Sequence, residues 1–552
     1  MPKTLRVLLG ATVAVALGTA ATVWATAAGA AHVATAPTVT ILYGTAPDYL
    51  DPQHSYTTQG GESTWVSYLG LYTYAHANGT AGGVVIPALA TALPVVSDGG
   101  KTYTMTLRKN LVYSNGVAVK ASDFAYSIER AIKLTWGGDS FYTGNIVGAT
   151  AYSTGKASTI SGIVSNNATG QITIHLLGPY GAFLNVLAFP SSGFVPTGTA
   201  MKDLTDDPPP GVGPYHVIDV VPDKSWVGEI NPYYAKEAIP GIPQGSVTVD
   251  ARVESNTATE TEDVLNNTAD LFDTGDSITP SLLPQITSTA SSRYKTIPVV
   301  QSFYFFLNVT EKPFNNQLVR EAVDIAIDRR ALSKLASGTI TPGCYLLPPG
   351  MIGHPTAPCP YGIVPDAAPN LAKAKALIKQ SGDAGAAVTV YSEERVPRTQ
   401  FCQYYASVLN AIGLKATIKP VADALYFPTI GTLKLHPQTG FADWDEDFPN
   451  PGDFYLLLDK NSITPTNGLN YGAVDDPKIQ NAIEKLDAIP SSQLNQYASD
   501  WTALDEYTAA KAYDIVFGYQ TWPEFASTRI DFSKLIVQPS YGWDWTSIHL
   551  NG

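Results

Sequence analysis

The stretch that decides the fold runs from Gln301 to Arg330 and reads QSFYFFLNVTEKPFNNQLVREAVDIAIDRR. Its aromatic beginning predicts a buried strand, and its second half has helical spacing. Five apolar residues recur at i, i+3, i+4, i+7 and i+8 and form one stripe: Val319, Ala322, Val323, Ala326 and Ile327. The charged residues fall on the opposite face: Arg320, Glu321, Asp324, Asp328 and Arg329. We therefore expect an amphipathic helix that packs on a core and exposes its charges to water.

The beginning of the chain has the features of an export signal. Two cations precede an apolar run over 7–31, and small residues that suit cleavage follow. We expect residues 1–36 to be a signal peptide. An uncleaved membrane anchor is the alternative, because the run exceeds the roughly 20 apolar residues that span a bilayer. No Cys precedes Cys344, so the thiol that anchors a lipoprotein is missing and retention at the cell is unexplained.

Composition and charge exclude some functions. The formal net charge is −14, and an acidic surface repels phosphate backbones, so we expect no nucleic-acid binding. Hydrophobic residues make up 45% of the chain and charged residues 15%, and no second long apolar run occurs. The part after the signal is therefore expected to be globular, with two or three domains at this length.

The cysteines suggest one cross-link. Cys344 and Cys359 bracket a loop rich in Pro and Gly, whereas Cys402 lies on a predicted helix. In an exported protein we favour a disulfide between Cys344 and Cys359, which would contribute ~3 kcal/mol to stability by closing the loop. Three buried thiols are the alternative.

The order of motifs around the central helix resembles a known family. Asn308, Pro313-Phe314-Asn315, Val319-Arg320 and Ala326-Ile327-Asp328-Arg329 follow one another as in the bacterial extracytoplasmic solute-binding proteins of the dipeptide, oligopeptide and nickel class. Upstream, Pro87-Ala88-Leu89-Ala90 and Ser97-Asp98-Gly99-Gly100-Lys101 are similar to the N-terminal block of that family. Strand and helix patterns also alternate through much of the second half, which independently favours α/β layering.

The resemblance implies an α/β, two-lobed periplasmic-binding-protein fold (class II, cluster C) with an extra domain inserted in the first lobe. The expected divisions are the first lobe at 37–70, 201–300 and 525–552, the extra α/β subdomain at 71–200, and the second lobe at 301–524. It also implies a function without covalent chemistry. We expect capture of a short peptide between two hinged lobes and delivery to the membrane permease of an ABC importer, by a monomer.

An acidic and aromatic stretch, DWDEDFPNPGDF from Asp443, has four interpretations. A calcium loop is rejected, because Phe448 stands where the sharp turn needs Gly. A pair of glycosidase carboxylates and a solvated acidic loop stay open. By resemblance, Trp444, Asp447, Phe448 and Pro451 match the family motif Trp-x-x-Asp-Tyr/Phe-x-x-Pro. The Asp of that motif holds the α-ammonium of the ligand in peptide-binding relatives, and Asp447 is the matching residue.

Other site residues also come from the resemblance. Arg395 and Arg398 follow a predicted strand where dipeptide-binding relatives place an Arg for the ligand carboxylate; surface salt bridges with nearby Glu residues are the alternative. Tyr43 and Gly44 lie where relatives line the floor of the pocket.

The sequence has no enzyme motif that we recognise, and its eight His residues show no metal-ligand spacing. We therefore expect no enzyme, metal site or cofactor. The alternatives are an oligosaccharide-binding protein of the same fold and, in a different class, a secreted glycoside hydrolase.

Overall fold

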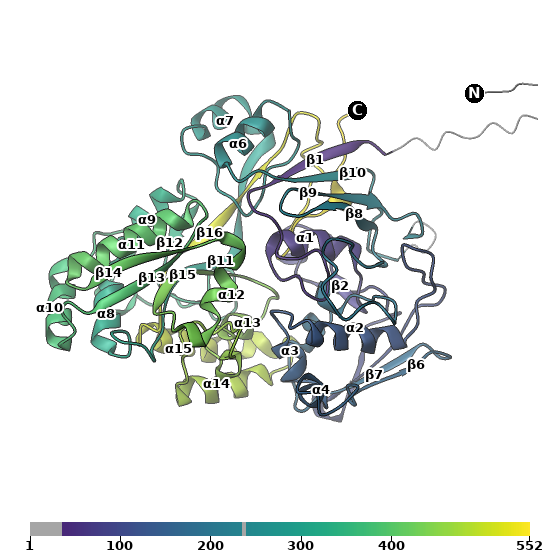
Figure 1. The fold of residues 1–552 in the computed structure, drawn as a ribbon, viewed down its shortest axis with the longest axis horizontal. Helices are drawn as coiled ribbons and strands as arrows, with labels where there is room; N and C mark the ends of the chain where they lie inside the picture. Colours follow the sequence, from purple (N-terminus) through teal and green to yellow (C-terminus); the bar gives the residue numbers. More distant parts are fainter. Residues whose placement is uncertain (1–35, 235–238) are drawn as a thin grey trace, which may run out of the picture. The chain divides into compact units, whose positions relative to one another are not determined.

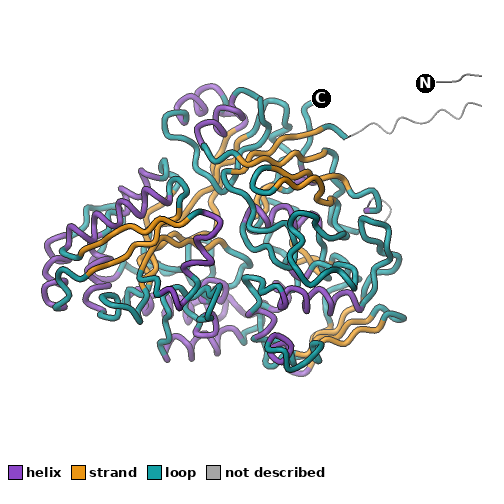
Figure 2. Tube along the Cα trace, in the orientation of Figure 1, coloured by secondary structure: helices purple, strands orange, loops and turns teal. Residues whose placement is uncertain are grey.

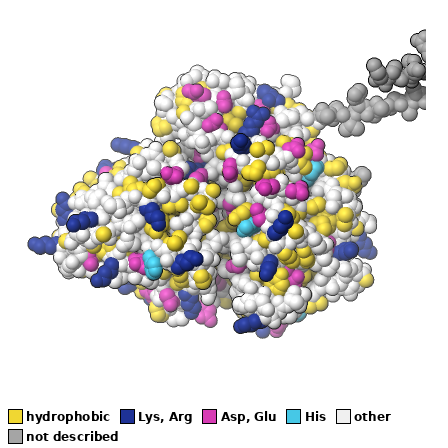
Figure 3. Space-filling model, in the orientation of Figure 1, with side chains coloured by type: hydrophobic (Ala, Val, Ile, Leu, Met, Phe, Trp, Pro, Cys, Tyr) yellow, Lys and Arg dark blue, Asp and Glu magenta, His cyan; other side chains and the backbone are white. Residues whose placement is uncertain are grey.

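The computed structural model describes residues 36–234 and 239–552. The predicted signal peptide lies outside the described residues, except for Ala36. None of the helices in the described ranges is long and apolar enough to cross a membrane. On the face shown in Figure 3, Lys and Arg side chains are distributed among acidic and apolar ones rather than gathered into one basic surface.

The first sheet is mixed and has the strand order β1-β10-β9-β8 (Figure 1). Strands β1 and β10 are parallel, and the other neighbours are antiparallel. The strands are β1 (Thr38–Tyr43), β8 (Tyr215–Val221), β9 (Ser225–Ile230) and β10 (Thr248–Val253). Helix α1 (Thr58–Ser67) contacts this sheet.

A small antiparallel sheet has the order β4-β5-β7-β6, and a hairpin of β2 and β3 precedes it along the chain. These strands are β2 (Tyr72–Tyr74), β3 (Val85–Pro87), β4 (Val95–Ser97), β5 (Thr102–Thr106), β6 (Ile163–Asn166) and β7 (Gln171–His175). The helices of this region are α2 (Ser122–Lys133), α3 (Ser140–Thr143), α4 (Ala149–Ser153) and α5 (Phe183–Val186). One continuous hydrophobic core joins the region to the first sheet.

The third main sheet has six strands in the order β12-β16-β11-β15-β13-β14. They are β11 (Tyr294–Leu307), β12 (Ile340–Pro342), β13 (Ala387–Glu393), β14 (Lys415–Val421), β15 (Thr439–Asp445) and β16 (Asp514–Phe525). Helices α8 (Gln317–Ala326), α9 (Arg329–Leu335), α10 (Leu371–Ser381) and α11 (Arg398–Ile412) lie along it (Figure 2). Two further cores contain most of its apolar side chains, while Val299 of β11 and Trp522 of β16 belong to the core of the first sheet.

Two long strands connect the six-stranded sheet to the first sheet. β11 and β16 pair along most of their length, from Phe306 back to Tyr294. Directly after β16, Ala526 bridges Leu271, which in turn bridges Ile41 of β1. The chain therefore passes between the two sheets through paired strands.

The remaining elements are shorter or lie around these sheets. They are α6 (Thr257–Leu265), α7 (Leu283–Thr289), α12 (Tyr426–Ile430), α13 (Pro451–Tyr455), α14 (Pro477–Asp487), α15 (Ala498–Ala509), β17 (Val537–Gln538) and β18 (Gly542–Trp543). Asp476 caps α14, because its side chain accepts a hydrogen bond from the N–H of Lys478. Pro477 lies in the first turn, where its missing N–H costs nothing.

The central stretch folds as predicted except for its charged face. α8 ends at Ala326, and Asp328 then caps α9. Three of the charges expected in water are buried: Arg320, Asp324 and Arg329. Arg329 pairs with Asp324 at 2.6 Å and donates to the carbonyls of Gly343 and Val516. The expectation was wrong because neighbouring loops cover this face and offer carbonyl acceptors, which helical periodicity does not reveal.

The disulfide between Cys344 and Cys359 is confirmed, and Cys402 is a buried free thiol. We expect the double variant Cys344→Ser/Cys359→Ser to lose ~3 kcal/mol of stability, because the unfolded chain gains loop entropy. Urea unfolding measures this loss. The reductant dithiothreitol should lower the midpoint of the wild type and leave that of the variant unchanged; equal midpoints without reductant would contradict the prediction.

A buried carboxylate ties the C-terminal segment to the first sheet. Glu62 of α1 accepts hydrogen bonds from Tyr43 Oη at 2.5 Å, Trp545 Nε1 at 2.8 Å and the N–H of Trp543 at 3.0 Å. Burial raises the pKa of Glu62 to about 8. In the unfolded chain Glu62 has its lower, ordinary pKa. The contribution of Glu62 to stability is therefore present at acidic pH and is lost as pH rises through about 8.

We accordingly expect the melting temperature of the wild type to fall between pH 5 and pH 8.5, and to fall less in Glu62→Gln. The loss is at most about 1.4 kcal/mol per pH unit for one group. Calorimetry across this pH range measures it. Glu262→Gln, which changes an exposed carboxylate, is the matched control and should keep the wild-type slope. An unchanged slope in Glu62→Gln would rule out Glu62 as a source.

Candidate functional site

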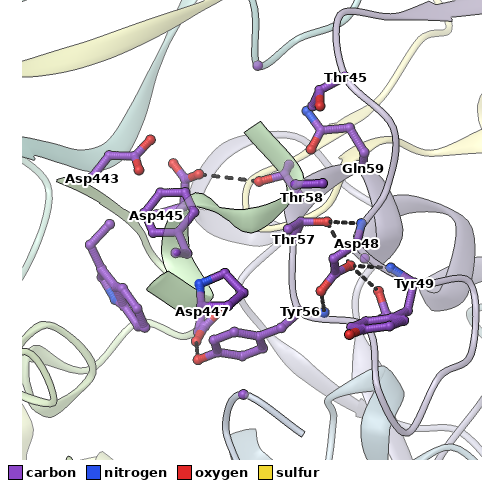
Figure 4. Close-up of a pocket in the computed structure, with 18 of the residues that line it drawn as sticks. Thr45, Asp48, Tyr49, Tyr56, Thr57, Thr58, Gln59, Asp443, Asp445 and Asp447 are labelled. Carbon is purple, nitrogen blue, oxygen red and sulfur yellow. Dashed lines mark hydrogen bonds between the residues drawn. The ribbon is translucent and has the colours of Figure 1, made fainter. Parts of the chain in front are cut away.

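A cavity of about 300 Å³ is lined by segments that are far apart in the sequence (Figure 4). One side comes from the segment after β1 and the start of α1, over residues 45–64. The other side comes from Arg395 and Arg398 at α11, from β15 and its following loop, and from Trp522 of β16. The volume lies at the lower end of the range of ligand pockets.

Three aspartates follow one another at alternate residues along this cavity. Asp443 and Asp445 end β15, and Asp447 follows in the loop. Because side chains alternate across a strand, the spacing i, i+2, i+4 directs them to one side. Figure 4 shows them in a row, opposite Thr58 and Tyr56. A solvated loop does not describe these three aspartates, since they line a cavity.

Asp447 lies where the sequence predicts a ligand-binding carboxylate. Its side chain accepts one hydrogen bond, from Tyr56 Oη at 2.7 Å, and no cation pairs with it among the described residues. Burial raises the pKa of Asp447 to about 7. A carboxyl with a raised pKa and no cation of its own gains most from an incoming ammonium group.

The loop after β15 is held by a second buried carboxylate. Asp453, which is fully buried, accepts hydrogen bonds from the N–H of Asp447 at 2.9 Å and from Trp444 Nε1 at 3.3 Å. Asn450 caps the short helix α13, on which Asp453 lies. The motif residues Trp444 and Asp447 are thus oriented by a residue of the same sequence stretch.

Both predicted arginines line the cavity, but each is already paired. Arg398 contacts Glu393 at 2.9 Å and Asp443 at 2.6 Å, all within the six-stranded sheet region. Arg395 contacts Asp276, which lies between α6 and α7, at 2.5 Å. The nearby charges of Asp276 and Asp273 raise the pKa of Arg395 against the effect of its burial. A ligand carboxylate would therefore have to compete with protein carboxylates for either arginine.

Tyr43 and Gly44 do not line the cavity. Tyr43 is buried, packs on Trp226 with ring centroids 5.0 Å apart, and donates to Glu62. Gly44 leaves room for Asp276, because a Cβ there would lie 1.6 Å from Asp276 Oδ2. The predicted pocket floor is thus displaced along the chain to Thr45 and beyond.

Sequence reasoning missed several lining residues. The largest omission is the segment from Asp48 to Gln59, which supplies Tyr56 and Thr58. Thr58 Oγ1 lies 3.4 Å from Asp445 Oδ2. The one sequence signal that we recognise in this segment is Asp51-Pro52, which predicts a turn. A turn does not indicate that Tyr56 will contact Asp447, 391 residues later. Among the described residues, no group of His, Cys, Asp and Glu has the arrangement of a metal site.

The comparison with protein families gives a match over most of the chain. Residues 84–465 match the family described as bacterial extracellular solute-binding proteins, family 5 Middle. This agrees with the resemblance that the central and N-terminal motifs suggest.

Individual relatives support the same conclusion. The chain is 28% identical over 340 residues to the glutathione-binding protein GsiB of Salmonella choleraesuis; the alignment covers 58% of this chain and only 59% of that relative. Among solved structures, the clavulanic acid biosynthesis oligopeptide binding protein 2 gives a TM-score of 0.81 at 21% identity, covering 94% of this chain and 97% of the other. Haemophilus influenzae OppA in complex with RPPGFSPFR gives 0.78 at 16% identity, covering 93% and 99%. These likenesses confirm the predicted fold class.

Proposed function

Since the chain belongs to the bacterial extracellular solute-binding proteins of family 5, we propose that it captures a short peptide in this cavity and delivers it to the permease of an ABC-type importer. The observation that carries the proposal is Asp447. Its carboxylate faces a cavity, has one hydroxyl partner and has no cation among the described residues. An α-ammonium group would supply the missing charge.

The proposal includes hinged closure around the ligand. Three contacts join the segment after β1 to the six-stranded sheet region: Thr45 with Asp423, Tyr56 with Asp447 and Thr58 with Asp445. The ion pair of Arg395 and Asp276 spans the same division. A ligand seated between these surfaces would hold them together, and the paired strands β11 and β16 would act as the hinge.

Binding without catalysis, export of the chain and a monomeric state are parts of the same proposal. They are supported by the family match, by the cavity that Trp444 and Asp447 line and by the apolar run at the start of the chain. The names of the relatives, which refer to glutathione and oligopeptide binding, favour a peptide over an oligosaccharide.

The experiment is native mass spectrometry of the protein purified from the export compartment, followed by calorimetric titration. The ligands are a short peptide, its N-acetylated form and an oligosaccharide. We expect the free peptide to bind at least about 100-fold more tightly than the acetylated one, because acetylation removes the charge that pairs with Asp447. Equal binding of both peptides, or a bound or cleaved oligosaccharide, would overturn the proposal.

A further inference from the structure

The cavity is lined by more carboxyl groups than one ammonium group would pair with. Six acidic residues line it: Asp48, Glu393, Asp423, Asp443, Asp445 and Asp447. Two arginines line it, Arg395 and Arg398, and each is in an ion pair. Some of the carboxylates that a ligand meets in this cavity lack a cation. Both arginines of the lining, in contrast, have a carboxylate partner.

Most of these carboxylates have protein partners. Asp48 accepts hydrogen bonds from the N–H groups of Tyr49 and Tyr56 and so closes its own loop. Asp443 and Glu393 share Arg398. Asp423 accepts a hydrogen bond from Thr45. These interactions explain four of the six acidic residues without a ligand.

Asp445 is different, because little in the protein satisfies it. One oxygen accepts a long hydrogen bond of 3.4 Å from Thr58, and Oδ1 is buried with no hydrogen-bond partner among the described residues. Burial and the charge of Asp443 raise the pKa of Asp445 well above its usual range. Its ionised form therefore gains from a cation placed beside Oδ1.

A second acceptor lies beside Asp445. Gln301 of β11 stands directly opposite Asp445 in the antiparallel ladder, so both side chains lie on one face of the sheet. Gln301 is 2% exposed and lines the cavity. Its Nε2 donates to Asp443 at 3.4 Å, while its Oε1 has no partner among the described residues. Two neighbouring residues of the ladder thus each have a buried oxygen, one of a carboxylate and one of an amide, without a hydrogen-bond donor among the described residues.

We propose that Asp445 and Gln301 form a second cation subsite, and that the preferred ligand is a peptide with a basic side chain in addition to its α-ammonium group. This inference rests on the proposed function, in which Asp447 takes the α-ammonium. An ammonium or guanidinium group supplies several donors and a positive charge, which match the two unpartnered acceptors. The paired arginines leave the ligand carboxylate without a dedicated partner, which also favours a ligand of net positive charge.

The test compares lysine with norleucine, which has nearly the same apolar stem without the ammonium group. Tripeptides of alanine with lysine at the first, second or third residue, and the three norleucine counterparts, are titrated calorimetrically at pH 7.5. We expect at least one lysine peptide to bind the wild type about 10-fold or more tightly than its counterpart. Asp445→Asn should abolish this preference, so that each lysine peptide binds this variant no more tightly than its norleucine counterpart.

Two further variants complete the design. Gln301→Met, which removes the amide acceptor at similar volume, should reduce the preference. Glu446→Gln makes the same change of charge one residue away, at a side chain that does not line the cavity, and should keep it. A wild type without the preference, or a preference that survives in Asp445→Asn, would overturn the second subsite while the norleucine peptides still report peptide binding.

Failure of the proposed function gives a separate result. If no peptide of either series binds the wild type, peptide binding is overturned, and 1,5-diaminopentane then tests the subsite by itself. Binding of this diamine that is lost in both Asp445→Asn and Asp447→Asn would support a site for two cations. No binding of the diamine would overturn the second subsite as well.

Discussion

Asp447→Asn is expected to lower the affinity for a short peptide by about 100-fold to 1,000-fold, which corresponds to about 3–4 kcal/mol. The variant keeps the shape of the side chain and its contact with Tyr56, but it removes the charge that we propose pairs with the α-ammonium. An ammonium group that closes into the cavity would lose hydration without gaining a counter-charge.

The unliganded protein should respond in the opposite direction. Burial raises the pKa of Asp447 to about 7, so above that pH the folded protein carries a buried ionised carboxylate, which costs it free energy relative to the unfolded chain. Removal of the carboxyl relieves this cost, and the melting temperature of unliganded Asp447→Asn at pH 8 should equal or exceed that of the wild type. Binding lost together with lower stability would point to a damaged fold instead.

A neighbouring residue provides the matched control for this variant. Burial also raises the pKa of Glu446 to about 7, but this side chain does not line the cavity. Glu446→Gln should therefore bind the peptide as the wild type does. Calorimetric titration of both variants measures the difference, and wild-type affinity in Asp447→Asn would remove Asp447 from the binding site.

Arg395→Gln is expected to weaken binding of every ligand, because it breaks the ion pair that joins the two sides of the cavity. Arg395 contacts Asp276 at 2.5 Å, and Asp273 lies near the same guanidinium. Burial and neighbouring acids already raise the pKa of Asp273 to about 6 and that of Glu260 well above its usual range. Without Arg395 these buried acids repel one another, and loss of one partner of a buried pair costs about 3–5 kcal/mol.

A double-mutant cycle separates closure from direct ligand contact. If Arg395 acts through Asp276, Arg395→Gln/Asp276→Asn should recover much of the affinity that Arg395→Gln loses, since no buried charge is then left without a partner. Small-angle scattering with and without peptide should show impaired closure in the single variant alone.

The sequence-based role of Arg395 makes a different prediction. An arginine that holds the ligand carboxylate requires that the wild type bind a C-terminally amidated peptide more weakly than the free acid, and that Arg395→Gln abolish this difference. Equal affinity of both peptides for the wild type would exclude a contact of Arg395 with the ligand carboxylate, and its role would be the ion pair with Asp276. The titration of both peptide forms against both proteins decides between these roles.

Local patterns in the sequence predicted the elements well. The aromatic run before Asn308 predicted β11, and the apolar stripe from Val319 predicted α8. Hydrophobic periodicity, helix caps and turn residues depend on residues close together in the chain, so they can be recognised in the sequence. The pairing of Cys344 with Cys359 also follows from their proximity along the chain.

The cavity was predicted in part. Trp444, Asp447 and both arginines line it. A compact motif pointed to Trp444 and Asp447, and the end of a predicted strand pointed to the arginines. Tyr43 and Gly44 were misplaced because a strand end does not state which residue faces the cavity. The offset of one or two residues turned Tyr43 toward the core and left Thr45 at the lining.

The class of fold, the family motifs and the acidic stretch with Asp447 could be recognised in the sequence, because each depends on residues close together along the chain. The partners of these residues depend on tertiary packing. Tyr56 reaches Asp447 across 391 residues, and Arg395 reaches Asp276 across 119. Arg398 pairs with Asp443 and Glu393, whereas Asp445 has no ion pair among the described residues. Burial and charge partners are properties of the packed chain, and they fix which carboxylates remain for a ligand.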